Sequence, residues 1–496
     1  MGAETRERSA EIRLPAVLAI GFTGHRTLPH EAQSRSVIYD FLAEKKASTA
    51  EILVGVTSVA AGGDLLFAES CLALEIPVRV LLPFEREEFA KDFDAATWER
   101  AEAVMRRAMS VEVIGDAAQR DEGYYACGIE TVLRSEWQMG LWNGEPAKGL
   151  GGTEQVLTFA NDIGRPVVWI HSVTGEVKLI GVKELAGIEA DPELRFLNRL
   201  GLAGVRGGGN VAADWLEKLD ANAMLVAPQV RRLAAVPIVC TAVAAVVSGA
   251  ASRMHASGLW VGVGALLGLT AGLLPAALKL GKRQALWVRI RTAAEVSRSV
   301  VALWEAPVQY EVVGPEVLPE LRGMIVSLNF LKSRKAGGEE GGVEGFKAKY
   351  MEERLLDQKR YFLRQSGKAA EKGARYRMVS KVCVVGAIAM SVWAFGGRTL
   401  LKTSDEAAGG SWLPLMASAL FQMATIAGAL LVVNECDRRQ RRYAEIAAAL
   451  GSWEAELKAF NTWRLVMPVV SKVERALLVE LLEWRSLLQN VKMPRH

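Results

Sequence analysis

Few of the 496 residues are cysteine or histidine, with five of each. The five cysteines lie far apart and form no C-x-x-C pair, and their odd number argues against a disulfide framework, which indicates a reducing compartment. The sequence has neither a Walker A motif nor a G-x-G-x-x-G motif, which disfavours a P-loop NTPase and a plain NAD dehydrogenase. Residues 1–13 are too charged for a signal peptide.

The chain also has little net charge, because 60 Lys and Arg nearly balance 56 Asp and Glu to give +4. Domains that bind nucleic acid concentrate far more positive charge, so no nucleic acid partner is expected. Half of the residues are hydrophobic, which excludes a disordered chain. The mean hydropathy of +0.15 lies between a soluble enzyme and a fully embedded chain, so we expect a mixture of the two.

Four segments contain no charged residue over lengths close to a membrane crossing: 233–252, about 258–278, 382–397 and about 411–434. A helix rises about 1.5 Å per residue, so about 20 residues cross a hydrocarbon core of about 30 Å. The alternative is buried core helices of a large soluble protein, which normally carry charge on one face. We therefore expect an all-α membrane region with four transmembrane helices in two hairpins.

Basic residues flank the outer ends of these hairpins, whereas the hairpin tips have few. By the positive-inside rule, the tips lie outside the cell and both termini in the cytoplasm of a multi-pass inner-membrane protein. The spans hold no ionisable side chain, which disfavours a proton-coupled carrier. The flanking clusters are Arg231 and Arg232; Lys279, Lys282, Arg283, Arg289 and Arg291; Lys372, Arg375, Arg377 and Lys381; and Arg438, Arg439, Arg441 and Arg442.

The first 175 residues alternate apolar strand patterns with helical patterns. This order predicts a Rossmann-like α/β domain, with a parallel sheet covered by helices on both faces. One continuous helix is expected over residues 87–108. The expected strands are residues 16–22, 51–58, 77–84, 111–115, 137–144 and, as the final strand, 166–171.

Glycine-containing turns follow three of these strands, and each turn leads into a helix. Glycine permits close backbone approach, and a helix N-terminus offers free N–H groups to an anion, so the turns predict a nucleotide-phosphate cradle at the carboxyl edge of the sheet. Arg26 and Lys148 add positive charge there. The candidate ligand-binding residues are Gly24, His25 and Arg26; Ser58, Gly62, Gly63 and Asp64; and Trp142, Asn143, Gly144, Lys148, Gly151, Gly152 and Thr153.

Simpler roles remain open for parts of this cradle. Any one glycine turn fits an ordinary strand-to-helix connection equally well. Asp64 is also in place for a helix cap, and His25 for a structural histidine. The convergence of three turns on one sheet edge is what favours a nucleotide or dinucleotide-like ligand.

These motifs resemble the SLOG superfamily, the Rossmann-like group related to the LOG and DprA proteins. The likeness covers about residues 15–172 and rests on GFTGHR, SVAAGGD, WNGEPAKGLGGT and GRPVVWI. It implies that nucleotides or nucleotide-derived signals bind among the three turns. Trp142, Asn143 and Gly144 would then face the base or ribose, and Gly151, Gly152 and Thr153 the phosphate.

The resemblance favours binding over catalysis. LOG-type enzymes hydrolyse a nucleotide N-glycosidic bond with a Glu two residues past the Thr of a Gly-Gly-x-Gly-Thr run. Gln155 occupies that position here, and Glu154 is displaced by one residue, or about 100° around the helix. We therefore assign no catalytic residue. The alternative, a membrane-anchored hydrolase of NAD or a nucleotide, has Glu154, Glu130 and Arg134 as candidates.

The C-terminal half resembles SLATT domains, the two-transmembrane effectors associated with SLOG proteins. The likeness covers about residues 340–465, with YMEERLLDQKRYF before a span pair and a long helix after it, and a weaker copy at about 225–306. It implies a prokaryotic antiphage effector, a homo-oligomer that permeabilises the membrane when it senses a nucleotide messenger from a partner synthase. No obligatory cofactor and no metal are expected.

The expected organisation places the nucleotide-binding domain at 1–175 and a linker at 176–230. The first hairpin and a cytoplasmic helix follow at 231–306. A second linker, 307–345, includes an amphipathic helix that could pack on the soluble domain or lie at the membrane surface. The SLATT-like region, with the second hairpin, covers 346–496.

Overall fold

The structure is a computed structural model, and its described part divides into two compact units. Unit 1 comprises Met1–Leu219 and Val296–Gly342, and unit 2 comprises Asp220–Glu295 and Val343–His496. The described residues are 12–115, 117–146, 149–181, 191–201, 210–253, 262–266, 268–269, 280–307, 318–335, 342–400 and 412–489.

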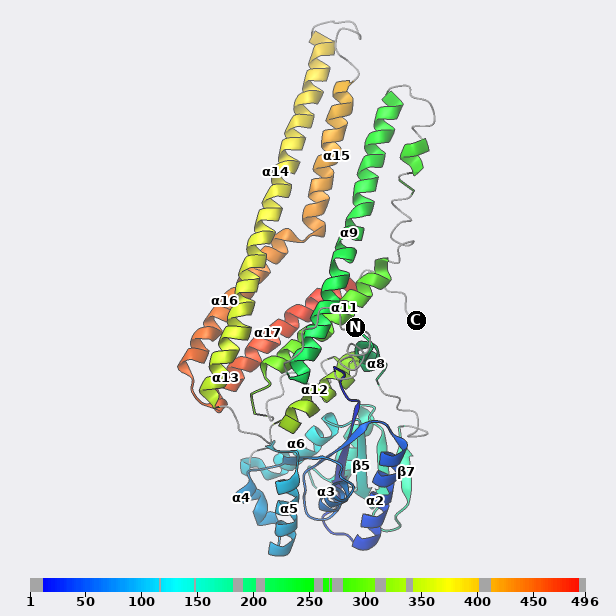
Figure 1. Ribbon diagram of the computed structural model, residues 1–496, viewed down its shortest axis with the longest axis vertical. Coiled ribbons are helices and arrows are strands. Elements are labelled where there is room, and N and C mark those ends of the chain that lie inside the picture. The colour runs from blue at the N-terminus through cyan, green and yellow to red at the C-terminus, as the bar shows by residue number, and fades with distance from the viewer. Residues whose placement is uncertain are drawn as a thin grey trace, which may run out of the picture. The chain divides into compact units, whose positions relative to one another are not determined.

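Unit 1 contains a seven-stranded sheet in the order β4-β3-β2-β1-β5-β6-β7 (Figure 1). The first six strands are parallel, as the sequence predicts. β1 lies between β2 and β5, so the carboxyl ends of these three strands, which the glycine turns follow, are neighbours in the sheet. The strands are β1 (Val17–Gly24), β2 (Ile52–Thr57), β3 (Val78–Leu82), β4 (Ser110–Val113), β5 (Trp137–Trp142), β6 (Val167–His171) and β7 (Val177–Ile180).

Alternate residues of β1 contact two different helix layers. Leu18 and Ile20 share a buried cluster with side chains of α2, α3 and α5. Ala19 instead shares a cluster with Cys127 of α6. This period of two is what a strand buried on both faces requires. The helices are α2 (Glu31–Ser48), α3 (Gly63–Ala73), α5 (Ala95–Arg107), α6 (Arg120–Leu133) and α7 (Thr153–Asp162).

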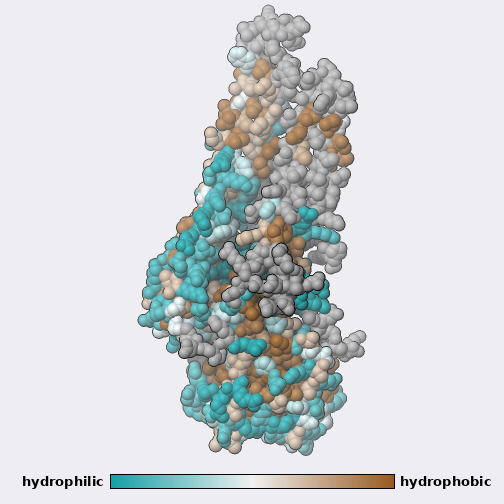
Figure 2. Space-filling view, viewed as in Figure 1, coloured by the Kyte–Doolittle hydropathy of each residue, from teal (hydrophilic) through white to brown (hydrophobic). Residues whose placement is uncertain are grey.

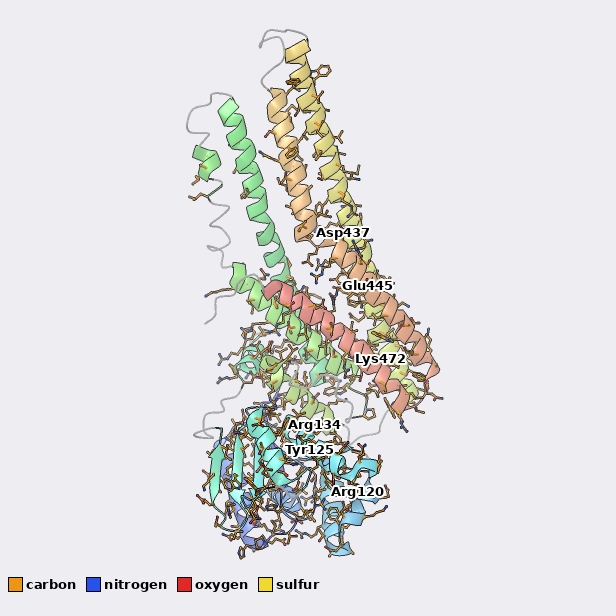
Figure 3. The ribbon with its side chains drawn as sticks, turned by 180° about the vertical axis from the view of Figure 1, so that it is seen from behind. Arg120, Tyr125, Arg134, Asp437, Glu445 and Lys472 are labelled. Atoms are coloured by element: carbon orange, nitrogen blue, oxygen red, sulfur yellow. The ribbon has the colours of Figure 1, made fainter. Side chains whose placement is uncertain are left out.

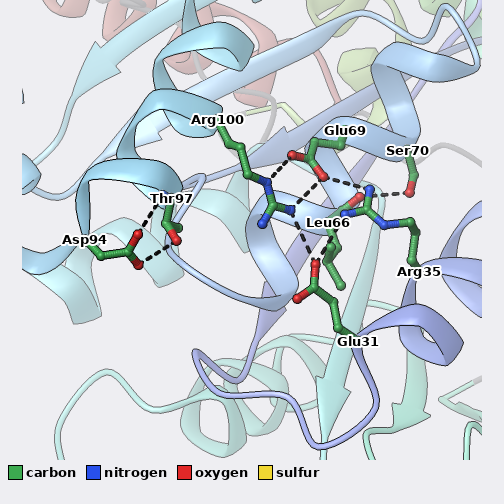
Figure 4. A network of polar contacts seen from close by, with 8 residues as sticks. All are labelled: Glu31, Arg35, Leu66, Glu69, Ser70, Asp94, Thr97 and Arg100. Atoms are coloured by element: carbon green, nitrogen blue, oxygen red, sulfur yellow. Dashed lines mark hydrogen bonds and ion pairs between the residues drawn. The ribbon is translucent and has the colours of Figure 1, made fainter.

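An ion-pair network joins α2, α3 and α5 at the surface (Figure 4). Glu69 of α3 accepts hydrogen bonds from Arg35 of α2 at 2.7 Å and from Arg100 of α5 at 2.8 and 2.9 Å. Both arginines also lie near Glu31. The network holds the three helices in register over the sheet.

The helix predicted over residues 87–108 is wrong, because the structure has two. α4 (Arg86–Phe89) ends before Asp94, and α5 begins at Ala95. The Asp94 side chain caps α5 by accepting a hydrogen bond from the backbone N–H of Thr97 at 2.9 Å (Figure 4). This capping signal is present in the sequence within an otherwise helical pattern.

The prediction that β6 is the final strand is also wrong. β7 pairs with β6 in the antiparallel direction, after a turn in which Gly175 has φ of +74°. Three of the four β7 residues are exposed, whereas the inner strands are largely buried. β7 covers what would otherwise be the edge of the parallel sheet.

α12 (Arg322–Lys335) packs on the sheet unit, which decides between the two placements open for the amphipathic helix. Arg322 pairs with Glu136 at 3.0 Å and donates to the Ser135 carbonyl at 2.8 Å. The Ser327 hydroxyl donates to the carbonyls of Gly323 and of Pro15, which immediately precedes β1. α8 (Pro192–Asn198) joins the same corner, where Asp191 accepts from the backbone of Gly323 at 2.9 Å.

Unit 2 is helical. α14 packs along α15 and α16, where Lys372 bonds Asn434 at 2.7 Å and Arg377 pairs with Asp437 at 2.6 Å (Figure 3 labels Asp437 at the start of α16). The helices that lie in this unit or enter it are α9 (Val211–Arg253), α11 (Leu280–Ala302), α13 (Val343–Tyr350), α14 (Asp357–Leu400), α15 (Trp412–Val433), α16 (Cys436–Ala459) and α17 (Trp463–Gln489).

A buried ion pair ties the start of α14 to α17. A π-helical turn, Met351–Leu356, carries Arg354 inward between α13 and α14. Arg354 donates to both carboxylate oxygens of Glu474, at 2.9 and 2.7 Å, and the Tyr350 hydroxyl adds a third bond at 2.8 Å. Satisfying the carboxylate in this way offsets its burial.

Two helices in the described part of the chain are long and apolar enough to cross a membrane, within Val343–Trp393 and Met416–Ala459. Only 11% and 18% of their apolar windows are buried, so they do not form the core of this chain. Figure 2 shows hydrophobic residues over the upper part of α14 and hydrophilic residues over its lower part and α16. Four spans are not supported: segment 233–252 lies in α9 without being one of these two helices, and 258–278 falls largely outside the described residues.

Candidate functional site

A cavity of about 850 Å³ lies in unit 1 beyond the carboxyl ends of β1, β2 and β5. The chain turns from β1 toward β2 on one side, while β5 pairs with β1 on the other. Open α/β sheets bind ligands at such a switch point. The cavity therefore occupies the place that the strand order predicts.

Backbone contacts join the first two glycine turns. Gly62 has φ of +86°, and a Cβ at this position would lie 2.3 Å from the His25 carbonyl oxygen, so only glycine fits. The N–H of Gly63 donates to the same carbonyl at 3.0 Å. The first turn is thus seated directly on the N-terminus of α3.

Asp64 ties these turns together from within α3. Its carboxylate accepts hydrogen bonds from the backbone N–H of Gly24 at 2.9 Å and from the Ser58 hydroxyl at 2.8 Å. Burial raises the pKa of Asp64 to about 6, although these hydrogen bonds act in the opposite direction. Its partners belong to the two turns, whereas the N-cap of α3 is Gly62, so Asp64 is a connecting group and not a plain helix cap.

His25 links the first turn to the turn after β5. His25 Nε2 lies 3.1 Å from the backbone nitrogen of Asn143 and 3.0 Å from the Asn143 side-chain oxygen Oδ1. The backbone N–H of His25 donates to the Leu141 carbonyl at 3.1 Å. His25 therefore has a structural role and also borders the cavity.

The third turn packs on α6 and begins α7. Gly151 has φ of +82°, and a Cβ there would lie 2.9 Å from the backbone nitrogen of Tyr125. The Gln155 side chain accepts a hydrogen bond from the Gly151 N–H at 2.8 Å. Gln155 thus holds the loop that leads into α7.

The cavity brings most of the predicted site residues together. Gly62, Gly63 and Gly144 are not among the lining residues, and Lys148 lies outside the described residues. Gly62 and Gly63 support the turns instead. The predicted residues that border the cavity are Gly24, His25, Arg26, Ser58, Asp64, Trp142, Asn143, Gly151, Gly152 and Thr153.

Sequence reasoning missed one wall of the cavity, which α6 supplies. Arg120, Asp121 and Tyr124 border it, together with Asp92 from the segment after α4. Figure 3 labels Arg120 at the start of this helix and Tyr125 further along it. These residues belong to no recognisable sequence motif. They are found at the cavity only because the connection from β4 to β5 places α6 there.

This wall determines where Arg26 lies. The Arg26 guanidinium carbon is 4.5 Å from the centroid of the Tyr124 ring, a cation–π contact. The Tyr124 hydroxyl donates to Asp92, and burial together with this bond raises the pKa of Tyr124 to about 12. No carboxylate pairs with Arg26 in the described part of the chain, so its charge remains available to an anion.

The residues proposed for hydrolysis lie apart. Glu154 borders the cavity at the start of α7, and its carboxylate accepts from the Thr158 hydroxyl at 3.3 Å. Glu130 instead pairs with Arg134 at 3.0 Å, and neither borders the cavity. Of the three residues proposed for hydrolysis, Glu154 is the one that borders the cavity and could contact a ligand there.

Comparisons with known proteins add no family to this description: no family model matches the chain, and no curated protein matches it either. Among the described residues, no three His, Cys, Asp or Glu side chains cluster in a way that could hold a metal ion.

Proposed function

We propose that this chain is a membrane effector that senses a nucleotide-derived messenger in unit 1 and responds by opening an oligomeric pore. The supporting observation is the cavity at the switch point, bordered by glycine turns, two helix N-termini and the unneutralised Arg26. Its volume of about 850 Å³ falls in the range of small-molecule sites, roughly 300–1,000 Å³. The SLOG-like motifs lie at this same edge.

The membrane part of the proposal rests on α14 and α15, whose apolar windows are largely exposed. We place them as the second hairpin and segments 233–252 and 258–278 as the first. The basic flanks then put both termini in the cytoplasm. The membrane that the helices cross would be the inner membrane of the cell. A SLATT-like effector would assemble several such hairpins into a pore and harm the cell during phage infection.

Gating follows from differential affinity. A messenger made by a partner synthase shifts the oligomer toward the open state only if it binds that state more tightly than the closed one. The glycine turns meet at β1, β2 and β5, so a ligand that contacts all three reports on their relative positions. The membrane helices would respond to a change in the relative positions of these three turns.

Dye leakage from vesicles that contain the purified full-length chain tests the proposal. We expect leakage with candidate cyclic nucleotides or ADP-ribose-like molecules that bind, and loss of both binding and leakage in Arg26→Gln. Arg106→Gln, an exposed arginine of α5 away from the cavity, is the matched control and should behave as the unchanged protein. Saturated binding without leakage would reject gating, and absence of binding would reject the sensor.

The alternative activity, N-glycosidic hydrolysis of NAD or a nucleotide, has one supporting observation: Glu154 borders the cavity. Incubation with NAD and nucleotides, followed by chromatography for the released base, tests it. If base release is abolished in Glu154→Gln and retained in Glu130→Gln, the site hydrolyses its ligand and does not only bind it.

A further inference from the structure

The cavity of unit 1 has more carboxylates than cations in its lining. The cations among the described lining residues are two arginines, Arg26 and Arg120. Acidic side chains therefore outnumber basic ones in the described lining. The bordering carboxylates are Asp64, Asp92, Asp121, Glu145 and Glu154.

Arg120 is not available to a ligand anion. Its guanidinium pairs with Glu88 at 2.6 Å and with Asp92 at 2.5 Å. Glu88 also pairs with Lys91 at 2.5 Å, so these four side chains together carry no net charge. Arg26, stacked on Tyr124, is the cation of the described lining that has no carboxylate partner. The described lining thus offers one arginine to an anion, within a wall that is otherwise acidic.

Each phosphate group of a ligand adds one to two negative charges. One phosphate can lie at Arg26 and the helix N-termini, but a second or third must approach carboxylates, and like charges repel strongly where water is partly excluded. Carboxylates instead accept hydrogen bonds from hydroxyl and amino groups. The lining therefore suits a molecule with one anionic end and a donor-rich remainder.

We infer, on the basis of the proposed nucleotide-sensing function, that the ligand is a nucleotide with a single phosphate group, as a monoester or a cyclic diester. Its phosphate lies at Arg26, and its ribose or base donors face the acidic part of the wall at Asp121. Nucleoside diphosphates, triphosphates and molecules with a pyrophosphate bridge are disfavoured.

Titration calorimetry on the full-length chain in detergent, with EDTA to remove divalent cations, tests this inference. The panel comprises AMP, GMP, cyclic AMP, cyclic GMP, ADP, ATP, ADP-ribose and a cyclic dinucleotide. We expect one or more single-phosphate nucleotides to bind, and the di- and triphosphate of the same base to bind at least about tenfold more weakly.

The outcomes separate the two proposals. Binding of ADP, ATP, ADP-ribose or the cyclic dinucleotide as tightly as a single-phosphate nucleotide overturns the inference and leaves the sensor in place. Binding of no member of the panel overturns both.

A charge-matched pair of variants tests the role of the acidic wall. Asp121 borders the cavity, whereas its neighbour Glu122 is exposed in the same first turn of α6 and does not. Asp121→Asn should narrow the affinity gap between mono- and diphosphate several-fold, and Glu122→Gln should leave it unchanged. Equal effects of the two substitutions would overturn the role given to the lining charge.

Discussion

At the scale of single residues, the candidate site is held together by groups that connect separate turns. Asp64 receives hydrogen bonds from two turns, and His25 receives one from a third. Gly62 lets backbones meet at distances that no Cβ permits. Substitutions here should therefore change stability and binding together.

Asp64→Asn should change how the stability of unit 1 depends on pH. The carboxyl has a pKa of about 6 in the folded protein, against 3.8 as the ordinary value, so the folded state binds this proton more tightly. The destabilisation from ionising Asp64 is absent below about pH 4, grows as pH rises and is complete above about pH 6. At about 1.4 kcal/mol per pKa unit, it amounts to about 3 kcal/mol.

Thermal and denaturant unfolding at pH 4 and pH 7 measure this effect. The stability of Asp64→Asn relative to the unchanged protein should rise by up to about 3 kcal/mol over that interval. Asp121→Asn, an exposed carboxylate at the same cavity, is the control. Identical pH profiles for Asp64→Asn and the unchanged protein would contradict the prediction.

Gly62→Ala should destabilise unit 1 by about 1–3 kcal/mol, because its backbone is left-handed and the added Cβ would meet the carbonyl oxygens of His25 and Arg26. Nucleotide binding should be lost as well. Gly149→Ala is the matched control, since a Cβ at Gly149 meets nothing within 4 Å. Melting temperatures of the two variants check the prediction, and similar values would contradict it.

At the scale of elements, α12 secures the amino edge of the sheet. Arg322 pairs with Glu136, whose carboxylate also accepts from the backbone N–H of Ala19 in β1 at 2.7 Å. β1 and β5 begin beside this contact and end at the cavity. A sequence element that could have lain on a membrane is thus part of the sheet unit.

Arg322→Met should destabilise unit 1 by about 2 kcal/mol, because it leaves the Glu136 carboxylate partly buried without its cation. Arg334→Met changes an exposed arginine of the same helix and should stay within about 0.5 kcal/mol of the unchanged protein. Denaturant unfolding followed by far-UV circular dichroism distinguishes them. Equal stability of the two variants would show that α12 is not anchored through Arg322.

At the scale of the whole molecule, a sheet unit with a cavity is joined in one chain to helices whose apolar surface is largely exposed in the described part of the chain. Large exposed side chains such as Val382, Val385 and Ile388 follow one another along α14. A single soluble chain rarely leaves such a surface open. A lipid bilayer around α14 would account for these exposed apolar side chains.

Ile388→Lys should oppose membrane insertion of α14, because a lysine near the centre of a span costs about 2.5–3.5 kcal/mol on insertion scales. Val479→Lys places the same charge on an exposed position of α17, outside the apolar windows, and should have no effect. The fraction of chain that resists alkaline extraction from membranes is the measurement. Equal extraction of both variants would argue against α14 as a span.

The sequence determined the parts of this protein that depend on local pattern. Apolar runs separated by helices are enough to predict six parallel strands, because a strand buried on both faces must be apolar throughout. Glycines at three strand ends predicted where the turns would meet. Uncharged segments predicted α14 and α15, since charge and length are read directly from residues.

Only the tertiary structure decided features that depend on residues far apart in the chain. Tyr124 and Arg120 join the site because the crossover from β4 returns α6 over β1, and no local motif marks them. The exposed strand β7 forms where β6 offers a free edge, and its own four residues do not specify that neighbour. Partners brought together across more than a hundred residues, such as His25 with Asn143, are set by packing, which a local pattern cannot specify.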